Sequence, residues 1–149
     1  MRKKVFSAAL GFCLFTAVIA VTVFAQQATT DPCLRATIPF DFNVRGKTLP
    51  AGSYEIRRVN DDMPNLLVIS NLKQKERAVF ETENVDPKTF TSKGEFIFHR
   101  YGDSYFLSEV FSGYGETGRE LTPSRQERTL RREMASNKAK PETVALAAD

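Results

Sequence analysis

The sequence has no tryptophan, one histidine and only two cysteines among its 149 residues. Cys13 lies in an apolar amino-terminal segment, so Cys33 is the only thiol outside that segment, and no internal disulfide is expected. We expect Cys33 to be a semi-buried thiol, with an intermolecular disulfide between two chains as the alternative. The single histidine, His99, excludes zinc sites built from several histidines, and the paired C-x-x-C, H-E-x-x-H and calcium-loop motifs are absent. We therefore predict no metal site and no cofactor.

The chain also lacks a large excess of charge of one sign. It has 21 Lys and Arg against 18 Asp and Glu, a net charge of +3. Arg2, Lys3 and Lys4 account for the whole surplus, so the remainder of the chain is neutral. Binding to the phosphates of a nucleic acid requires a basic face. We therefore predict no nucleic-acid partner.

The three basic residues begin a segment with the layout of a signal peptide. An uncharged, mostly apolar run follows from Val5 to Phe24, and Val23-Phe24-Ala25 precedes a cleavage site at Gln26. This pattern predicts an exported protein, periplasmic or extracellular. The alternative is an uncleaved anchor, because about twenty apolar residues also span a bilayer. In that case the leader would be the only membrane contact.

After the leader, the chain consists mainly of short segments with strand-like alternation. Twelve phenylalanines and a hydrophobic content of 42% are typical of a folded domain. Turn residues separate the strand-like segments, and no helical period lies between them. The pattern predicts a mainly β fold, an antiparallel sheet arranged as a small sandwich or a partly open barrel. The expected strands are 36–44, 53–59, 66–72, 77–85, 95–101 and 104–111.

The strongest local signal is a hairpin around Gly102-Asp103, a glycine-first pair suited to a tight turn. A regular two-residue loop pairs Arg100 with Tyr105, Phe98 with Leu107 and Phe96 with Glu109. On the opposite face it pairs His99 with Phe106 and Ile97 with Ser108. A slip of one residue would exchange the two faces.

The character of the sequence changes near the carboxyl end. Ser124 and Glu127 fit a capping box behind Pro123, which predicts one helix with a thin apolar stripe. The small and polar residues after it are typical of a disordered tail. The expected organisation is a signal peptide (1–25), an amino-terminal linker (26–35), a β-domain (36–121), a carboxyl-terminal helix (122–135) and a disordered tail (136–149).

Five side chains of the hairpin are candidates for ligand binding. Tyr101 and Tyr105 are able to stack on a ligand, although packing at the rim of the core explains them as well. Glu109 and Arg100 share a face in the regular register, where an ion pair is the simpler interpretation. His99 beside Phe106 is expected to be a structural residue.

Catalytic arrangements have weaker support. A serine–histidine–aspartate set can be drawn from Ser104 or Ser108 with His99 and Asp103. All of these crowd one hairpin, however, and no nucleophile elbow accompanies them. We therefore predict no catalytic residues. Arg125, Arg128 and Arg132 along the helix are expected to form a solvated face, because glutamates are interspersed with them.

Two stretches carry a resemblance to a known group of proteins. Residues 40–54 contain F-x-F-x-V-x-x-K-x-L-P-A-G-x-Y, and residues 98–107 read F-H-R-Y-G-D-x-Y-F-L. This pattern resembles an uncharacterised family of small exported bacterial β-domain proteins over about residues 36–125. The resemblance implies a bacterial exported β-domain and no activity, so it assigns no functional residue.

These observations favour an exported, non-enzymatic β-domain that binds an unknown protein or envelope component. One alternative is a carrier that holds an apolar small molecule in an open barrel lined by Phe40, Phe42, Phe96 and Phe98. A second alternative is a hydrolase-type enzyme that uses His99 with Glu109 or Asp103. The alternatives differ in where they place His99 and in how the phenylalanines pack.

Overall fold

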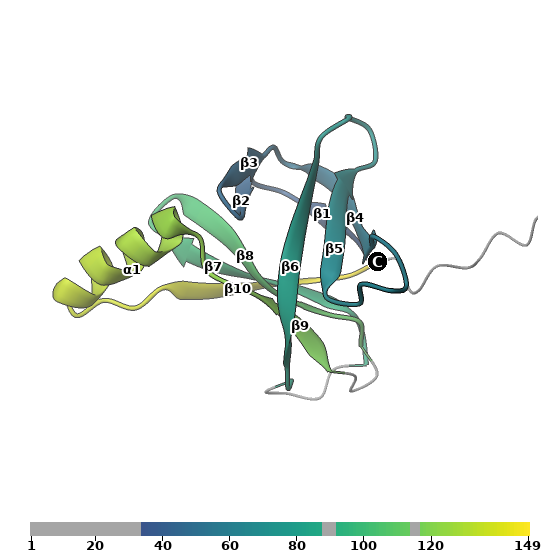
Figure 1. Cartoon of the computed structure of the whole chain (residues 1–149). Helices are drawn as coiled ribbons and strands as arrows, with labels where there is room; N and C mark the ends of the chain where they lie inside the picture. The colour runs from purple at the N-terminus through teal and green to yellow at the C-terminus, as the bar shows by residue number, and fades with distance from the viewer. Residues whose placement is uncertain (1–33, 88–91, 114–116) are drawn as a thin grey trace, which may run out of the picture.

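The computed structural model describes residues 34–87, 92–113 and 117–149. These residues form ten strands and one helix, arranged as Figure 1 shows. The elements are β1 (Leu34–Ile38), β2 (Phe42–Val44), β3 (Lys47–Leu49), β4 (Gly52–Arg58), β5 (Leu66–Asn71), β6 (Arg77–Val85), β7 (Glu95–Tyr101), β8 (Ser104–Phe111), β9 (Gly118–Leu121), α1 (Arg125–Ser136) and β10 (Glu142–Ala147).

The strands form an open sheet in the order β1-β4-β5-β6-β9-β8. Beyond β8 come β7 and then β10, while the β2–β3 hairpin lies beside the first residues of β8. All pairings are antiparallel except that of β2 with β8. The sheet curls so that its two ends approach, and the N–H of Asp149 donates to the carbonyl of Arg35 at 2.8 Å. The prediction of a mainly β, antiparallel-rich fold with a single helix near the carboxyl end is confirmed.

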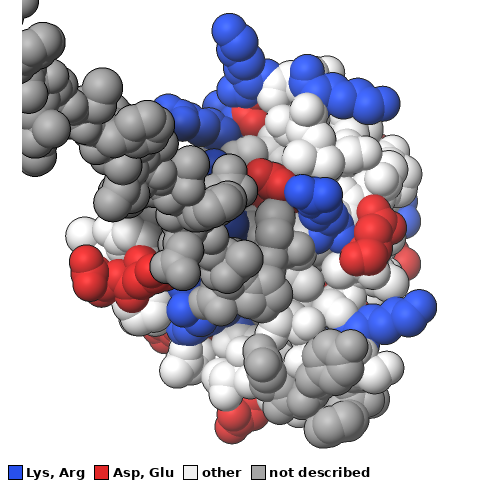
Figure 2. Space-filling view, turned by 90° about the vertical axis from the view of Figure 1, so that its right-hand side faces the viewer, with Lys and Arg blue, Asp and Glu red and all other residues white. Residues whose placement is uncertain are grey.

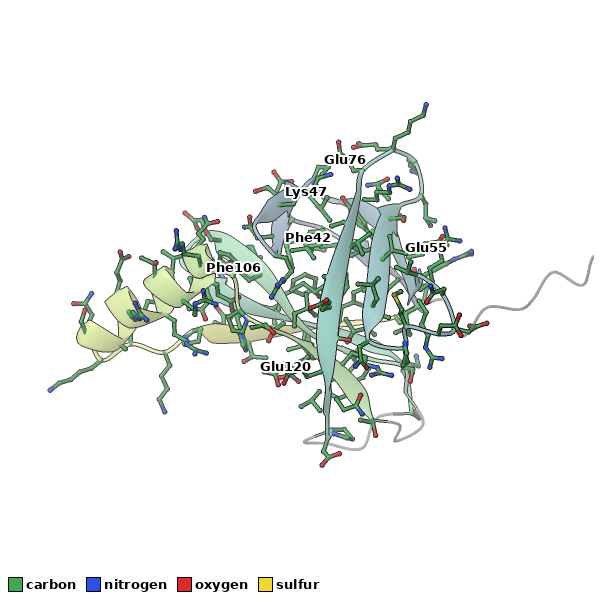
Figure 3. The ribbon with its side chains drawn as sticks, in the orientation of Figure 1. Phe42, Lys47, Glu55, Glu76, Phe106 and Glu120 are labelled. Atoms are coloured by element: carbon green, nitrogen blue, oxygen red, sulfur yellow. The ribbon has the colours of Figure 1, made fainter. Side chains whose placement is uncertain are left out.

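The concave side of the sheet holds an aromatic core. Phe42 lies at its centre (Figure 3), with ring centroids 5.0 Å from Tyr54 and 5.5 Å from Phe98. Phe40 packs edge-on to Phe98 at 5.3 Å. Alternate residues of each strand supply these side chains, as expected for strands with one buried face. At one end, Lys47 joins the β2–β3 hairpin to the β5–β6 turn through Glu76, with Nζ and Oε2 2.8 Å apart.

The single strand predicted over 36–44 is two strands in the structure. β1 ends at Ile38, and β2 begins at Phe42 after a bend. Pro39 lies in this bend, where its missing N–H costs no ladder hydrogen bond. The bend takes the chain from one edge of the sheet, beside β4, to the other half, beside β8.

The prediction of a disordered tail over 136–149 is wrong for residues 142–147. These form β10, which pairs with the edge of β7 along its whole length. Val144, Leu146 and Ala148 alternate toward the core and pack against it. This alternation covers few residues, and most of their side chains are small. It therefore predicts a strand only when the unpaired edge of β7 is known.

The helix begins at Arg125 and ends at Ser136, within three residues of the predicted start and one of the predicted end. Ser124 caps it, because its hydroxyl accepts a hydrogen bond from the N–H of Glu127 at 3.1 Å. Figure 1 shows α1 on the left, against the end of the β7–β8 hairpin. One face of the hairpin therefore meets the aromatic core and the other meets the helix.

On the face of the molecule shown in Figure 2, acidic and basic side chains lie next to one another. Such mixing is typical of a solvated protein surface. This face therefore offers a partner charges of both signs.

Candidate functional site

The five predicted site residues of the hairpin lie on two opposite faces. Arg100 and Tyr105 face each other on the side that carries Phe98. His99 and Tyr101 alternate with them and therefore project from the other side, toward α1. The structure thus groups four of the five as two pairs, and the fifth, Glu109, lies further along β8. Cys33 lies outside the described residues.

A β-bulge separates the observed hairpin register from the predicted one. The pairs of Arg100 with Tyr105, His99 with Phe106 and Phe98 with Leu107 are confirmed. Ser108 is then the extra residue of the bulge, because Ile97 pairs with Glu109. The predicted pairs of Phe96 with Glu109 and of Ile97 with Ser108 are therefore wrong.

The bulge also changes the surroundings of Glu109. Its partner Ile97 lies on the face of His99, so Glu109 and Arg100 occupy opposite faces of the hairpin. The register therefore does not place the two side chains on one face, as the expected ion pair required. Arg100 pairs instead with Glu142 of β10, with Nη1 and Oε2 3.3 Å apart.

A polar cluster lies between the hairpin and the helix. Nδ1 of His99 is 3.2 Å from Oε1 of Glu127, and its Nε2 is 3.4 Å from Oγ of Ser108. The hydroxyl of Tyr101 donates to the same Oε1 at 3.4 Å. The bulge brings Ser108 into this cluster, which agrees with the tendency of bulges to redirect a side chain.

Glu127 is the member of this cluster that the sequence interpretation missed. It is the one buried residue of α1, although it is flanked by the exposed Gln126 and Arg128. The capping box already explains why a glutamate occupies this position, so the sequence offered no reason to expect a contact between Glu127 and the sheet. Only the spacing of Glu127, Leu130 and Met134 hints that these three side chains share one face.

The cluster has the connectivity of a serine–histidine–carboxylate set, in which the histidine lies between the other two groups. Ser108, however, is only 4% exposed, so its hydroxyl is closed to a substrate of any size. The imidazole of His99 is 23% exposed, and its Nε2 contacts this hydroxyl. These contacts give hydrogen-bond partners to the buried carboxylate of Glu127, whose burial without partners would cost several kcal/mol of stability. They also join the helix to the sheet.

The cluster raises the pKa of the Tyr101 phenol to about 12. Burial is the main cause, because the ionised phenolate would lose its hydration. The nearby carboxylate of Glu127 adds to the effect, because it repels a second negative charge. The neutral phenol is therefore the form that the folded protein favours.

We expect the protein to lose stability as the pH rises from about 10 to about 12. The pKa of Tyr101 is higher in the folded chain than its ordinary value of 10.0, so its contribution is complete below pH 10 and disappears above 12. The shift corresponds to at most about 2–3 kcal/mol. Burial also raises the pKa of Tyr54, so the phenolate absorbance gained near pH 12 should fall by the amount of one tyrosine in Tyr101→Phe and stay unchanged in Tyr105→Phe. An unchanged gain in Tyr101→Phe would contradict the assignment.

On the opposite face, Tyr105 is enclosed by its neighbours. Its ring stacks on Phe40 with centroids 3.8 Å apart, and the guanidinium of Arg100 lies 5.4 Å from its centre. Arg100 also donates from Nε to the carbonyl of Gly102 at 2.7 Å. Cation–π and stacking contacts therefore occupy both groups, which supports packing rather than ligand stacking.

A hollow of the described surface lies between the start of the helix and the β2–β3 turn. It has a volume of about 720 Å³ and is open to solvent. Its lining contains three arginines and no carboxylate. We call it the arginine hollow, and its lining residues are Arg45, Gly46, Pro123, Ser124, Arg125, Gln126, Arg128, Thr129 and Leu130.

Backbone carbonyls hold two of these arginines in place. Arg45 donates from Nη1 to the carbonyl of Thr122 at 3.1 Å, and Arg128 donates to that of Pro123 at 2.7 Å. Each contact uses only part of a guanidinium, which has five N–H donors. The two groups are therefore oriented and still able to bind an anion.

The backbone of Arg45 has an uncommon conformation for its residue type. Arg45 and Gly46 form the two-residue turn between β2 and β3, with φ of 51° and 90°. Asparagine and glycine normally occupy the first position of such a turn, because a bulkier L-residue pays about 1 kcal/mol there. The strained backbone at Arg45 therefore indicates that its side chain has a role that offsets the strain.

Other kinds of site have less support. Within the described residues, no group of three or more His, Cys, Asp or Glu side chains is placed to hold a metal ion. The helix that the structure describes is neither long nor apolar enough to cross a membrane. No protein-family model, curated protein or solved structure matches the chain.

Proposed function

We propose that the chain is an exported, non-enzymatic bacterial β-domain that works in the periplasm or outside the cell as a binding or envelope-associated module. Its partner in this proposal is an anionic group, carried by an envelope component or a protein, that occupies the arginine hollow. The observation that supports this most is the lining of that hollow, with three guanidiniums and no carboxylate. The basic, then apolar, leader supports export.

The chemistry of the hollow suits phosphate or carboxylate groups. Guanidinium groups bind both kinds of anion through paired N–H donors, and such charge-assisted hydrogen bonds are the strong ones. Arg45 and Arg128 are already held by carbonyls, so less side-chain entropy is lost when an anion binds. Arg125, at the first turn of the helix, supplies the third positive charge.

The packing of the aromatic core favours a binding module over a carrier of apolar molecules. Phe40 and Phe42 each contact Phe98 ring against ring, so these side chains occupy much of the space that a ligand would need. Phe96 is fully buried in the same cluster. The hydrolase alternative has the connectivity of His99 in its favour, but its serine is buried.

Calorimetric titration with pyrophosphate and with citrate tests the proposal. We expect at least one of them to bind with an affinity that falls as salt is added. Arg125→Ala combined with Arg128→Ala should weaken binding at least about tenfold, because two charge-assisted contacts are lost. Arg132→Ala is the matched control, because Arg132 belongs to the same helix but lies outside the lining.

Arg45→Asn separates a functional role of Arg45 from a structural one. Asparagine suits the left-handed turn, so the unfolding free energy should stay equal or rise by up to about 1 kcal/mol. Anion binding should nevertheless weaken. Binding of neither probe, equal loss in Arg132→Ala, or a lower stability of Arg45→Asn with unchanged binding would overturn the proposal.

A further inference from the structure

The arginine hollow is larger than the anionic group that the proposed function places in it. Its volume of about 720 Å³ lies within the range of about 300–1,000 Å³ that is usual for sites of small organic molecules. The hollow lies where the β2–β3 turn meets the first turns of α1 (Figure 1). An occupant that fills it therefore consists of an anionic group and an organic body.

Three guanidiniums reach the hollow from two elements. Arg125 and Arg128 are three residues apart in α1, so their side chains share one face of the helix. Arg45 comes from the β2–β3 turn, and its anchor is the carbonyl of Thr122. The anchor of Arg128 is the carbonyl of the next residue, Pro123. The three positive charges therefore converge on one part of the hollow.

The negative charge of the helix start is directed away from the hollow. Glu127 is the one carboxylate in the first two turns of α1, and it is buried against the β7–β8 hairpin, with Oε1 3.2 Å from Nδ1 of His99. Within the described residues, no salt bridge involves Arg45, Arg125 or Arg128. An anion that enters the hollow therefore breaks no existing ion pair and meets no carboxylate in the described lining.

Three guanidiniums match a phosphomonoester better than they match a carboxylate. A phosphomonoester carries about −1.5 to −2 charges at neutral pH and exposes three acceptor oxygens. A carboxylate carries a single negative charge and exposes two oxygens. Guanidiniums bind such oxygens through paired N–H donors. Two guanidiniums are therefore enough for a carboxylate, whereas a phosphomonoester offers an oxygen to each of three.

The rest of the lining restricts the organic body of the ligand. Pro123 and Leu130 are its large apolar members, and the described lining contains no aromatic side chain and no carboxylate. Nucleic-acid bases are commonly bound by stacking on aromatic rings. Ammonium groups are bound by carboxylates or by aromatic faces. The lining therefore favours an aliphatic body that has neither a base nor a positive charge.

We propose that the arginine hollow binds a phosphomonoester group attached to an aliphatic body. The three guanidiniums hold the phosphate oxygens, and the body lies against Pro123 and Leu130. This inference rests on the proposed function, because it names the class of anion that the same hollow takes. A soluble ester and the headgroup of an envelope lipid share this chemistry.

Calorimetric titration of the protein with hexyl phosphate, hexyl sulfate and hexanoate tests the choice of anion. The three probes share one body. The sulfate has as many free oxygens as the phosphate but a single charge, and hexanoate has fewer oxygens as well. We expect hexyl phosphate to bind at least about tenfold more tightly than hexanoate, with hexyl sulfate between them.

The outcomes separate this inference from the proposed function. If hexanoate binds as tightly as hexyl phosphate, or if citrate binds and hexyl phosphate does not, the inference is wrong while the proposed function stands. If neither these probes nor pyrophosphate and citrate bind, both are wrong.

Arg125→Gln tests the role of the third guanidinium. It should weaken the binding of hexyl phosphate about tenfold and that of hexanoate by less, because two guanidiniums already suffice for a carboxylate. Arg132→Gln is the matched control, because Arg132 belongs to the same helix but lies outside the lining. It should change neither affinity. Equal losses for the two probes in Arg125→Gln would show that the hollow does not distinguish them by the third guanidinium, and the inference would fall.

Leu130→Ala tests the contact with the aliphatic body. Hexyl phosphate should bind the wild type more tightly than methyl phosphate does, and Leu130→Ala should reduce this difference. The affinity for methyl phosphate should stay unchanged, which would show that the arginines keep their positions. Equal affinities of the two esters for the wild type would mean that the hollow does not recognise the body, against the proposal.

Sedimentation with phosphatidylcholine vesicles distinguishes a lipid headgroup from a soluble ester. Added phosphatidic acid presents a phosphomonoester, whereas an equal fraction of phosphatidylglycerol presents a diester. An excess of binding to phosphatidic acid that disappears in Arg125→Gln supports a lipid headgroup. Binding of hexyl phosphate without such an excess supports a soluble ester. An excess that persists in Arg125→Gln arises outside the hollow and contradicts the proposal.

Discussion

Replacing Leu146 with aspartate is expected to lower the free energy of unfolding by about 3 kcal/mol. Leu146 lies in β10 opposite Phe96, and its side chain packs against the aromatic core. A carboxylate at this position loses part of its hydration and gains no cation, while the contacts of the leucine are lost. Urea unfolding followed by circular dichroism measures the change.

The neighbouring residue provides a matched control for Leu146. Ala145 lies in the same strand but points outward and is exposed, so Ala145→Asp should change stability by at most about 0.5 kcal/mol. A chain that ends at Lys140 should be destabilised as strongly as Leu146→Asp, and should aggregate, because it exposes the edge of β7. Equal stability of Leu146→Asp and Ala145→Asp would show that β10 does not contribute to the fold.

Replacing Phe98 with alanine should cost about 3–5 kcal/mol. Phe98 is fully buried and contacts the rings of both Phe40 and Phe42, so its removal leaves a cavity between the two halves of the sheet. The loss combines the transfer free energy of the ring with the contacts that its neighbours no longer make.

The effect of Phe98→Ala should also reach beyond the site of the change. Phe40 stacks on Tyr105, so a loosened Phe40 should alter the near-ultraviolet dichroism of that tyrosine. Leu72→Ala is the control, since Leu72 is largely exposed and its truncation should cost less than about 0.5 kcal/mol. A similar cost for the two variants would contradict the central position of Phe98.

The β7–β8 hairpin shows which part of the fold the sequence predicts and which part it does not. Gly102-Asp103 defines the turn of the β7–β8 hairpin, and the first four pairs beyond it follow from that turn alone. The fifth pair fails, because Ser108 forms a bulge. A bulge adjusts the local twist of a strand to its neighbours. In this sheet the neighbours of β8 include β2, which comes from a distant part of the sequence.

In the candidate site, too, the sequence suggests some of the residues and only the structure reveals the others. His99 and Tyr101 were named as candidates from the hairpin, whereas Arg125 and Arg128 were expected only to form a solvated face of the helix. Glu127 was assigned to the helix cap, and its burial depends on the docking of α1 against β7. The arginine hollow likewise needs Arg45, which is far from the helix in sequence and is brought there by the contact of its side chain with Thr122.

The sequence by itself determined the features that arise within a few residues. These are the mainly β class, the turn at Gly102, the cap at Ser124 and the neutral balance of charge beyond the first four residues. Only the tertiary structure decided which edge receives residues 142–147, where the bulge falls and which carboxylate meets His99. The reason is physical: turns and caps depend on local backbone preferences, whereas edge pairing and burial gain their free energy from partners that chain folding must first bring together.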